Sequence, residues 1–233
     1  MRVTKKILFF LIISVSFIFS GFAFAEANLP FTGEDPGLAI AYDGLPLAQP
    51  ISFDTLQDVG QPQLQVSKTI PVNDFVQTLI DGNVNTIRGL YVDNKFAFPV
   101  VQQPSGNAGF VSTTEDVITD FSMPRKYGVT GLLAHNYLAG VEFFTLEIGD
   151  LVQVVYGDGS IQMYRVSDIQ SYQALSPNSA SSNFVDLATS EKLTANQLFK
   201  RVYMGEHHLT LQTCIQQGSE DSWGRLFVIA DPV

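Results

Sequence analysis

The chain contains one cysteine, Cys214, and its thiol is the first candidate for chemistry. A free thiol is only a few per cent thiolate at neutral pH, so a working nucleophile needs a base or a cation beside it. Histidines occur at positions 135, 207 and 208. On a straight strand His208 lies roughly 20 Å from Cys214, and His207 lies farther, so neither reaches the thiol. His135 follows the apolar run 131–134 and precedes a turn, which places it at the same rim of the fold.

Arg225 completes the set of candidate residues. It opens the last strand, and a ten-residue loop, 215–224, is expected between that strand and the one ending at Cys214. Consecutive strands joined in this way pair antiparallel, so Arg225 is expected opposite Cys214. Each residue also has a purely structural interpretation: Cys214 as a small buried side chain, His135 as a hydrogen-bonded core or surface histidine, Arg225 as the charged end of a strand.

The elements that must position these residues are mostly short strands. Alternating or continuous apolar runs predict strands at 87–101 (around an Asp-Asn turn), 131–135, 150–156, 161–166, 208–214 and 224–230, with a further apolar stretch at 141–146. Two helices are predicted, one at 72–80 and one at 191–199 with Ser190 as its N-cap. Many strands, little helix and short connections favour an all-β barrel or sandwich.

Composition excludes several classes of function. Apolar residues make up 45% of 233 residues, enough for a core, and the length suits one domain with appendages. The formal charge of −10 provides no basic surface for nucleic acid. A single cysteine excludes an intramolecular disulfide and a multi-thiolate zinc site.

The N-terminus is typical of an export segment. Arg2, Lys5 and Lys6 precede an apolar run to Ala25, and Ala23-Phe-Ala25 is a small-x-small cleavage pattern. Uncleaved, residues 7–25 would just span a bilayer at about 28 Å of helix. The protein is therefore expected outside the cytoplasm, either secreted or anchored to the outer face of the cytoplasmic membrane through residues 1–25.

The candidate residues lie in segments that resemble one family. Thr210-Leu-Gln-Thr-Cys214 resembles the TLxTC signature of sortases, the exported cysteine transpeptidases of bacterial surfaces. Leu133-Ala-His-Asn136 and residues 143–166 are similar to the family's histidine segment and the hairpin after it. Residues 87–101 resemble its first strands, and residues 225–228 resemble its arginine strand. The resemblance covers about residues 84–233, with Ala134 where the family usually has glycine.

The resemblance implies a closed, eight-stranded, sortase-like β-barrel with short helices, whose Cys214, His135 and Arg225 meet in a surface groove. It implies that Cys214 attacks the Thr–Gly carbonyl of an LPXTG-like sorting signal and that His135 protonates the leaving amine and deprotonates the incoming one. Arg225 would hold the oxyanion or the substrate backbone, and Thr213 and Thr210 would contact the substrate. The implied partners are LPXTG-type surface proteins and an amine acceptor of the cell wall or a pilin, with no cofactor and no metal.

Three segments are therefore expected: residues 1–25 as signal peptide or anchor, 26–83 as an extended arm, and 84–233 as the catalytic barrel. The arm itself contains an LPXTG motif directly after the export segment. The motif is either a coincidence in a Pro/Gly-rich stretch or a pseudosubstrate or self-processing site for the chain's own groove. Its residues are Leu29, Pro30, Phe31, Thr32 and Gly33.

Other classes of function remain as rivals. The first is a non-catalytic exported barrel that has the same residues but binds surface peptides or glycans and catalyses no reaction. An L,D-transpeptidase is disfavoured because its SHGC-type motif is absent, and papain-like chemistry because no CGSCW segment occurs.

Overall fold

The computed structural model describes residues 70–179 and 181–233. These residues lie within one of the two compact units of the chain, Thr32–Val233. The predicted export segment, the motif at 29–33 and most of the predicted arm lie outside the described residues.

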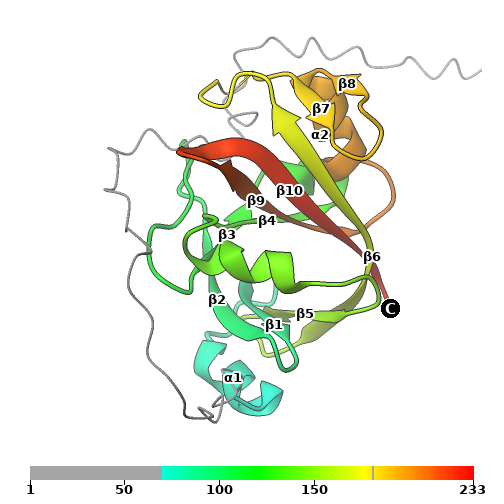
Figure 1. Ribbon diagram of the computed structural model, residues 1–233. Helices are drawn as coiled ribbons and strands as arrows, with labels where there is room; N and C mark the ends of the chain where they lie inside the picture. The colour runs from blue at the N-terminus through cyan, green and yellow to red at the C-terminus, as the bar shows by residue number, and fades with distance from the viewer. Residues whose placement is uncertain (1–69, 180) are drawn as a thin grey trace, which may run out of the picture. The chain divides into compact units, whose positions relative to one another are not determined.

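Eight strands form a closed barrel (Figure 1). They are β1 (Ile87–Val92), β2 (Phe96–Gln102), β3 (Ile118–Phe121), β4 (Thr130–Leu133), β5 (Leu151–Tyr156), β6 (Ile161–Ala174), β9 (Leu209–Gln217) and β10 (Glu220–Pro232). The order around the ring is β10–β9–β4–β3–β2–β1–β5–β6, and β6 also pairs with β10, which closes it. Pairs β2–β3 and β4–β9 are parallel and the others antiparallel. The prediction of a closed, eight-stranded, all-β barrel is confirmed.

Apolar side chains from all eight strands fill the barrel. Because side chains alternate across a strand, every second residue faces this interior. The buried set includes Ile87, Leu90, Phe96, Phe98, Ile118, Leu132, Val152, Val154, Tyr164, Val166, Leu209, Leu211, Leu226 and Val228. Burial of this interior face fixes the register of each strand, since a slip by one residue would turn its apolar set outward.

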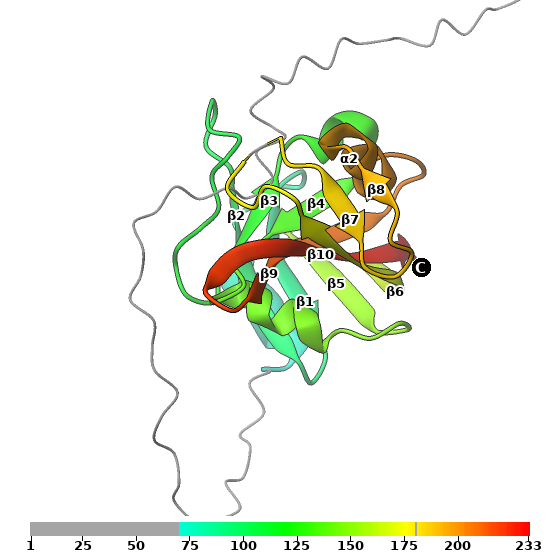
Figure 2. The same cartoon turned by 45° about the horizontal axis from the view of Figure 1, so that its top comes forward.

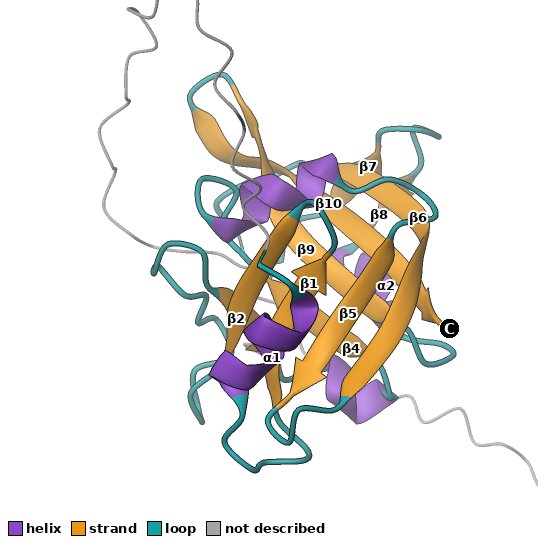
Figure 3. Ribbon diagram, turned by 90° about the horizontal axis from the view of Figure 1, so that it is seen from below, coloured by secondary structure: helices purple, strands orange, loops and turns teal. Residues whose placement is uncertain are grey.

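Short helices pack against the barrel. Helix α1 (Val72–Leu79) confirms the first helix prediction. Its Phe75 and Val76 pack against Tyr91 of β1 and Val155 of β5, and Figure 3 shows the helix lying over this part of the sheet. The predicted arm at 26–83 thus includes a helix that packs on the barrel. Two 3-10 helices, η2 (Pro124–Tyr127) and η3 (Ala139–Thr145), flank β4, and η3 occupies most of the apolar stretch expected at 141–146.

The second helix prediction was wrong by one turn. Helix α2 spans Ala195–Tyr203, and its N-cap is Thr194, not Ser190. The Thr194 hydroxyl accepts from the Gln197 backbone N–H at 3.2 Å, and the Gln197 side chain accepts from the Thr194 N–H at 2.9 Å, which makes a capping box. Ser190 has a left-handed φ of 63° and lies in the loop between two extra strands, β7 (Phe184–Asp186) and β8 (Lys192–Leu193).

The connections between strands follow turn chemistry. Asn94 takes a left-handed φ of 59° in the predicted Asp-Asn turn between β1 and β2. The predicted β5–β6 hairpin is confirmed, and β6 runs on to Ala174. The predicted ten-residue loop after Cys214 was wrong, because β9 and β10 continue to a two-residue turn at Gly218 and Ser219. Figure 2 shows these two strands side by side.

Candidate active site

Cys214 and Arg225 lie directly opposite each other on neighbouring strands. In the antiparallel ladder of β9 and β10, Cys214 pairs with Arg225. Opposite residues of such a pair point to the same face, with strands about 4.8 Å apart. The predicted register between the thiol and the guanidinium is confirmed, although the connection that sets it is a hairpin and not a long loop.

His135 comes from the strand on the other side of β9. In the parallel ladder of β4 and β9, Leu133 pairs with Gln212, and the Ala134 N–H donates to the Gln212 carbonyl at 3.2 Å. His135 and Cys214 each come two residues after that pair. Beyond His135 the chain turns, since the N–H groups of Leu138 and Gly140 donate to the His135 carbonyl at 3.0 and 2.9 Å. The strand predicted at 131–135 with His135 as its last residue ends earlier, at Leu133, whereas the turn predicted after His135 is confirmed.

The three side chains share the outer face of the barrel. Leu209 and Leu211 of β9 belong to the interior core, so alternation along the strand turns Cys214 outward. Leu226 likewise faces inward, which turns Arg225 outward. Ala134 belongs to the interior core as well, so His135, which follows β4, points outward. The thiol and guanidinium therefore lie on β9 and β10, and the imidazole lies just beyond the end of β4. They lie on the outside of the barrel wall, whereas the sequence placed them only at a rim.

The site is buried. Cys214, His135 and Arg225 are 5%, 6% and 2% exposed. The Arg225 Nη1 donates to the carbonyls of Ser222 and Gly224 at 2.9 and 2.8 Å. Its Nε is buried and has no hydrogen-bond partner among the described residues. A buried donor without a partner is uncommon and costly, so this N–H is available to a ligand oxygen.

Two neighbours of His135 hold its loop, and sequence reasoning missed both. The Tyr137 ring stacks on the imidazole, with centroids 5.1 Å apart and planes at 20°, while 57% of Tyr137 stays exposed. The Asn136 amide donates to the Asp221 carbonyl at 3.1 Å, which ties the histidine loop to β10. Only their adjacency to His135 in the sequence could have suggested them.

Gly140 permits the close approach of η3 to this loop. A Cβ on Gly140 would lie 2.3 Å from the Thr213 Oγ1 and 2.6 Å from the His135 carbonyl oxygen. These two contacts leave no space for a side chain at position 140, so glycine is required where η3 passes Thr213 of β9. The glycine itself, four residues after Asn136, is the sequence feature that could have indicated this close approach.

The two threonines predicted to contact substrate are both fully buried. The Thr210 hydroxyl donates to the Val202 carbonyl at 2.6 Å and so helps to seat α2 on the barrel. Thr213 lies on the inward-facing side of β9, against Gly140. Either hydroxyl would have to move from this position to touch a substrate, and their role in binding stays a prediction.

The other two histidines have structural partners at the opposite end of β9. The two ring nitrogens of His208 lie 2.7 and 3.1 Å from the carbonyls of Glu206 and Val202. The Nε2 of His207 lies 3.0 Å from the Tyr164 hydroxyl, and its Nδ1 lies 2.7 Å from the Gly128 carbonyl. Excluding them as bases for Cys214 was correct.

Two cavities lie elsewhere on the barrel. One of about 210 Å³ is lined by Arg125 and Tyr156, near Asp120, and the other, of about 510 Å³, lies beside β6. Burial raises the pKa of Asp120, against the opposing effect of its ion pair with Arg125. The described residues hold no group of three or more His, Cys, Asp or Glu arranged to bind a metal ion. No helix in this part of the chain has the length and apolar character needed to cross a membrane.

Comparison with known proteins found no matching family model and no matching curated protein. Solved structures similar in fold include sortase A from Corynebacterium diphtheriae (TM-score 0.43, 15% identity, 69% of this chain and 67% of that one). Others are sortase C1 from Streptococcus suis (0.42, 14%, 70% and 78%) and sortase C1 from Streptococcus agalactiae in complex with MTSET (0.41, 16%, 67% and 73%). Each of these structures is a sortase. At this level of similarity they carry no argument about activity, so the barrel rests on the strand pairing above.

Proposed function

We propose that the protein is a sortase-type cysteine transpeptidase that acts outside the cytoplasm on LPXTG-like sorting signals of surface proteins. The observation that carries this proposal is the shared outer face of β4, β9 and β10, where Cys214 lies opposite Arg225 and next to the strand that leads to His135. The family motif around each residue supplies the substrate class.

The reaction would proceed through a thioester. The Cys214 thiolate attacks the Thr–Gly carbonyl, and the Arg225 Nε donates to the oxyanion or to a substrate carbonyl. As the C–N bond breaks, the His135 imidazolium gives its proton to the leaving glycine amine. The neutral imidazole then takes a proton from an incoming amine, whose nitrogen displaces the Cys214 sulfur and forms a new amide bond. The acceptor would be an amine of the cell wall or of a pilin.

Cleavage of a fluorogenic LPXTG peptide tests this function. Wild-type protein should cleave the peptide and form the hydroxamate when hydroxylamine is the acceptor, whereas Cys214→Ala should do neither. The reason is that Cys214 is the single thiol of the chain. Binding of the peptide without thiol-dependent cleavage would support the rival, a non-catalytic barrel that binds surface peptides or glycans, which the low exposure of Cys214 favours.

We further propose that the motif at 29–33 acts on the chain's own site as a pseudosubstrate or self-processing sequence. Helix α1 packs on the barrel, so about 38 residues separate the motif from the packed part of the chain, and a flexible tether of that length would span about 35 Å, so reach is not limiting. Self-processing predicts a break after Thr32 in wild type that is absent in Cys214→Ala, read by intact mass. Occlusion predicts that deleting residues 26–40 raises peptide turnover, and unchanged turnover together with identical N-termini would contradict both forms.

A further inference from the structure

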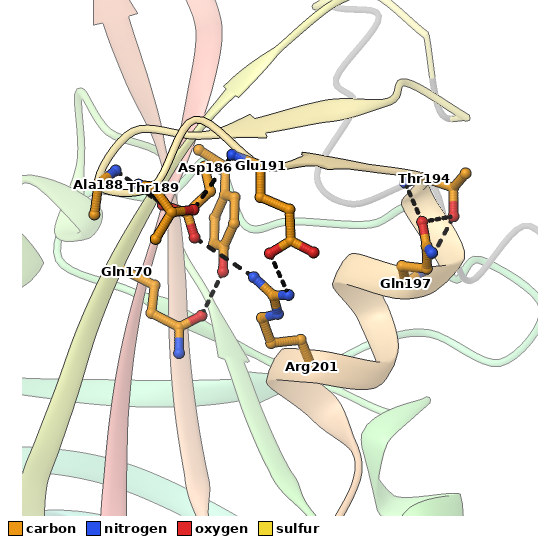
Figure 4. Close-up of polar contacts among 9 residues, drawn as sticks. Gln170, Asp186, Ala188, Thr189, Glu191, Thr194, Gln197 and Arg201 are labelled. Carbon is orange, nitrogen blue, oxygen red and sulfur yellow. Dashed lines mark hydrogen bonds and ion pairs between the residues drawn. The ribbon is translucent and has the colours of Figure 1, made fainter.

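The larger of the two cavities lies on the same outer face as the candidate active site. Its volume is about 510 Å³. The floor is the middle of β6, the roof is the loop after β7, and one side is Arg201 of α2 (Figure 4). The lining residues contributed by β6 run from Asp168 to Tyr172. We call this cavity the β6 pocket.

The strand register connects the β6 pocket to Cys214. Tyr172 on β6 pairs with Arg225 on β10, which in turn pairs with Cys214 on β9. On its other side Tyr172 pairs with Asp186 of β7. The floor of the pocket is thus two strands from the thiol, about 10 Å at the usual spacing, and on the side away from β4 and His135.

The edge of β6 beside the pocket is open. Strand β5 pairs with β6 only as far as Arg165, and β7 begins to pair at Tyr172. Between them, at 167–170, no described strand pairs with this side of β6. The Ser171 carbonyl accepts from the Leu187 N–H at 3.0 Å, so alternation of the ladder turns the backbone of Ile169 to the same side. The Ile169 N–H donates to the Asp168 carboxylate at 2.8 Å, so the Ile169 carbonyl is the group that this edge offers to a peptide N–H. An open edge of this kind accepts an added strand.

The charge of the pocket favours a cation. Asp168 is exposed, and it accepts hydrogen bonds from the Ile169 N–H at 2.8 Å and the Gln170 amide at 2.6 Å, neither of them charged. Arg201 is already paired with Glu191 at 2.8 Å and Asp186 at 3.5 Å. Its hydrogen bond with Glu191 raises the pKa of the guanidinium, so it stays bound to its acids. Acidic groups therefore outnumber the one lining cation.

We propose that the β6 pocket binds an extended peptide segment, which pairs with the open edge of β6 and places a Lys or Arg side chain beside Asp168. This segment is the part of the substrate directly before the motif, five or more residues ahead of the scissile bond, a point that rests on the proposed function. In that function His135 serves the leaving amine, so the acyl portion extends the other way, past Arg225. Asp168 lies four residues along β6 from Tyr172, about 13 Å, which places it about 16 Å from the thiol, and about five extended residues span that distance.

Binding to the Cys214→Ala protein tests the pocket without requiring turnover. Fluorescein-labelled LPXTG peptides would carry two lysines or two glutamates at the first and second positions before the motif, and anisotropy would be read at low salt. The lysine peptide should bind about threefold to fivefold more tightly, the size expected for an exposed ion pair. Adding Asp168→Asn should remove most of that preference, whereas Asp158→Asn, in the exposed β5–β6 turn, should keep it.

A second peptide tests the strand pairing. N-methylation of the backbone at those upstream positions removes a donor and should weaken binding, while N-methylation at the peptide N-terminus should not. Equal binding of the lysine, glutamate and N-methylated peptides would overturn the proposal. Preferred binding of the lysine peptide by Cys214→Ala, combined with no cleavage of the peptide by wild-type protein, would uphold the pocket and reject the transpeptidase.

Discussion

Replacing His135 with alanine is expected to lower kcat/KM for an LPXTG peptide by about 10²–10⁴-fold, the usual contribution of a positioned acid–base group. Two steps lose their proton donor or acceptor: expulsion of the glycine amine and attack by the acceptor. The variant lacks the acid that expels the amine at every pH, so its activity should stay low in alkaline buffer as well. The measurement is a pH profile of kcat/KM for wild type and His135→Ala.

His207→Gln is the matched control for this prediction. His207 lies at the opposite end of β9, and glutamine can still hydrogen-bond to the Tyr164 hydroxyl and the Gly128 carbonyl that the histidine contacts. The control should retain wild-type turnover. If both variants lost activity equally, the loss would reflect damage to the fold, and if His135→Ala retained full activity, the acid–base role would be wrong.

Replacing Arg225 with alanine is expected to lower kcat by about 10²–10³-fold, the range for loss of one oxyanion donor. The donor in question is the buried Nε, which has no partner among the described residues. Arg225→Lys should not restore activity, because an ammonium on a flexible stem cannot both bond the carbonyls of Ser222 and Gly224 and present a second donor to the substrate. Initial rates over a range of peptide concentrations would separate kcat from KM.

Arg225 also stabilises the bulged end of the β9–β10 hairpin, so stability must be measured beside turnover. Urea unfolding of Arg225→Ala should show a loss of about 1–3 kcal/mol from the unpaired Ser222 and Gly224 carbonyls. Arg88→Ala, which removes an exposed ion pair with Asp81, serves as the control and should change neither quantity by much. An Arg225→Ala protein that is less stable yet turns over normally would show that the residue is only structural.

Most of the strands could be predicted because their signals are local, whereas the closed barrel was implied by the family resemblance, since the patterns alone left a sandwich open. The apolar-rich runs at 150–156 and 161–166 on either side of a Gly-Asp-Gly turn, and the Asp-Asn turn near residue 94, each indicate a hairpin within a few residues. The helix at 195–203 was misplaced because Ser190 and Thr194 are both acceptable N-caps by type. The capping box at Gln197 and the left-handed backbone of Ser190 decide between them, and β8 takes up the residues before the helix.

Only part of the candidate site could be predicted. The pairing of Arg225 with Cys214 followed from two consecutive strands, whatever the length of the turn between them. The outward face of the three side chains depends on which side of β9 is filled by core leucines, and that is set by the whole barrel. The stacking of Tyr137 on His135 and the pocket beside β6 depend on contacts between segments far apart in sequence, which no local pattern encodes.

Intact mass spectrometry of the protein mixed with an LPXTG peptide, in the absence of an amine, tests the central claim most directly. The account predicts an adduct equal to the peptide's acyl portion through its threonine, on Cys214, that hydroxylamine removes and that Cys214→Ala never forms. An adduct on another residue, or none with any sorting peptide while the peptide still binds, would contradict it.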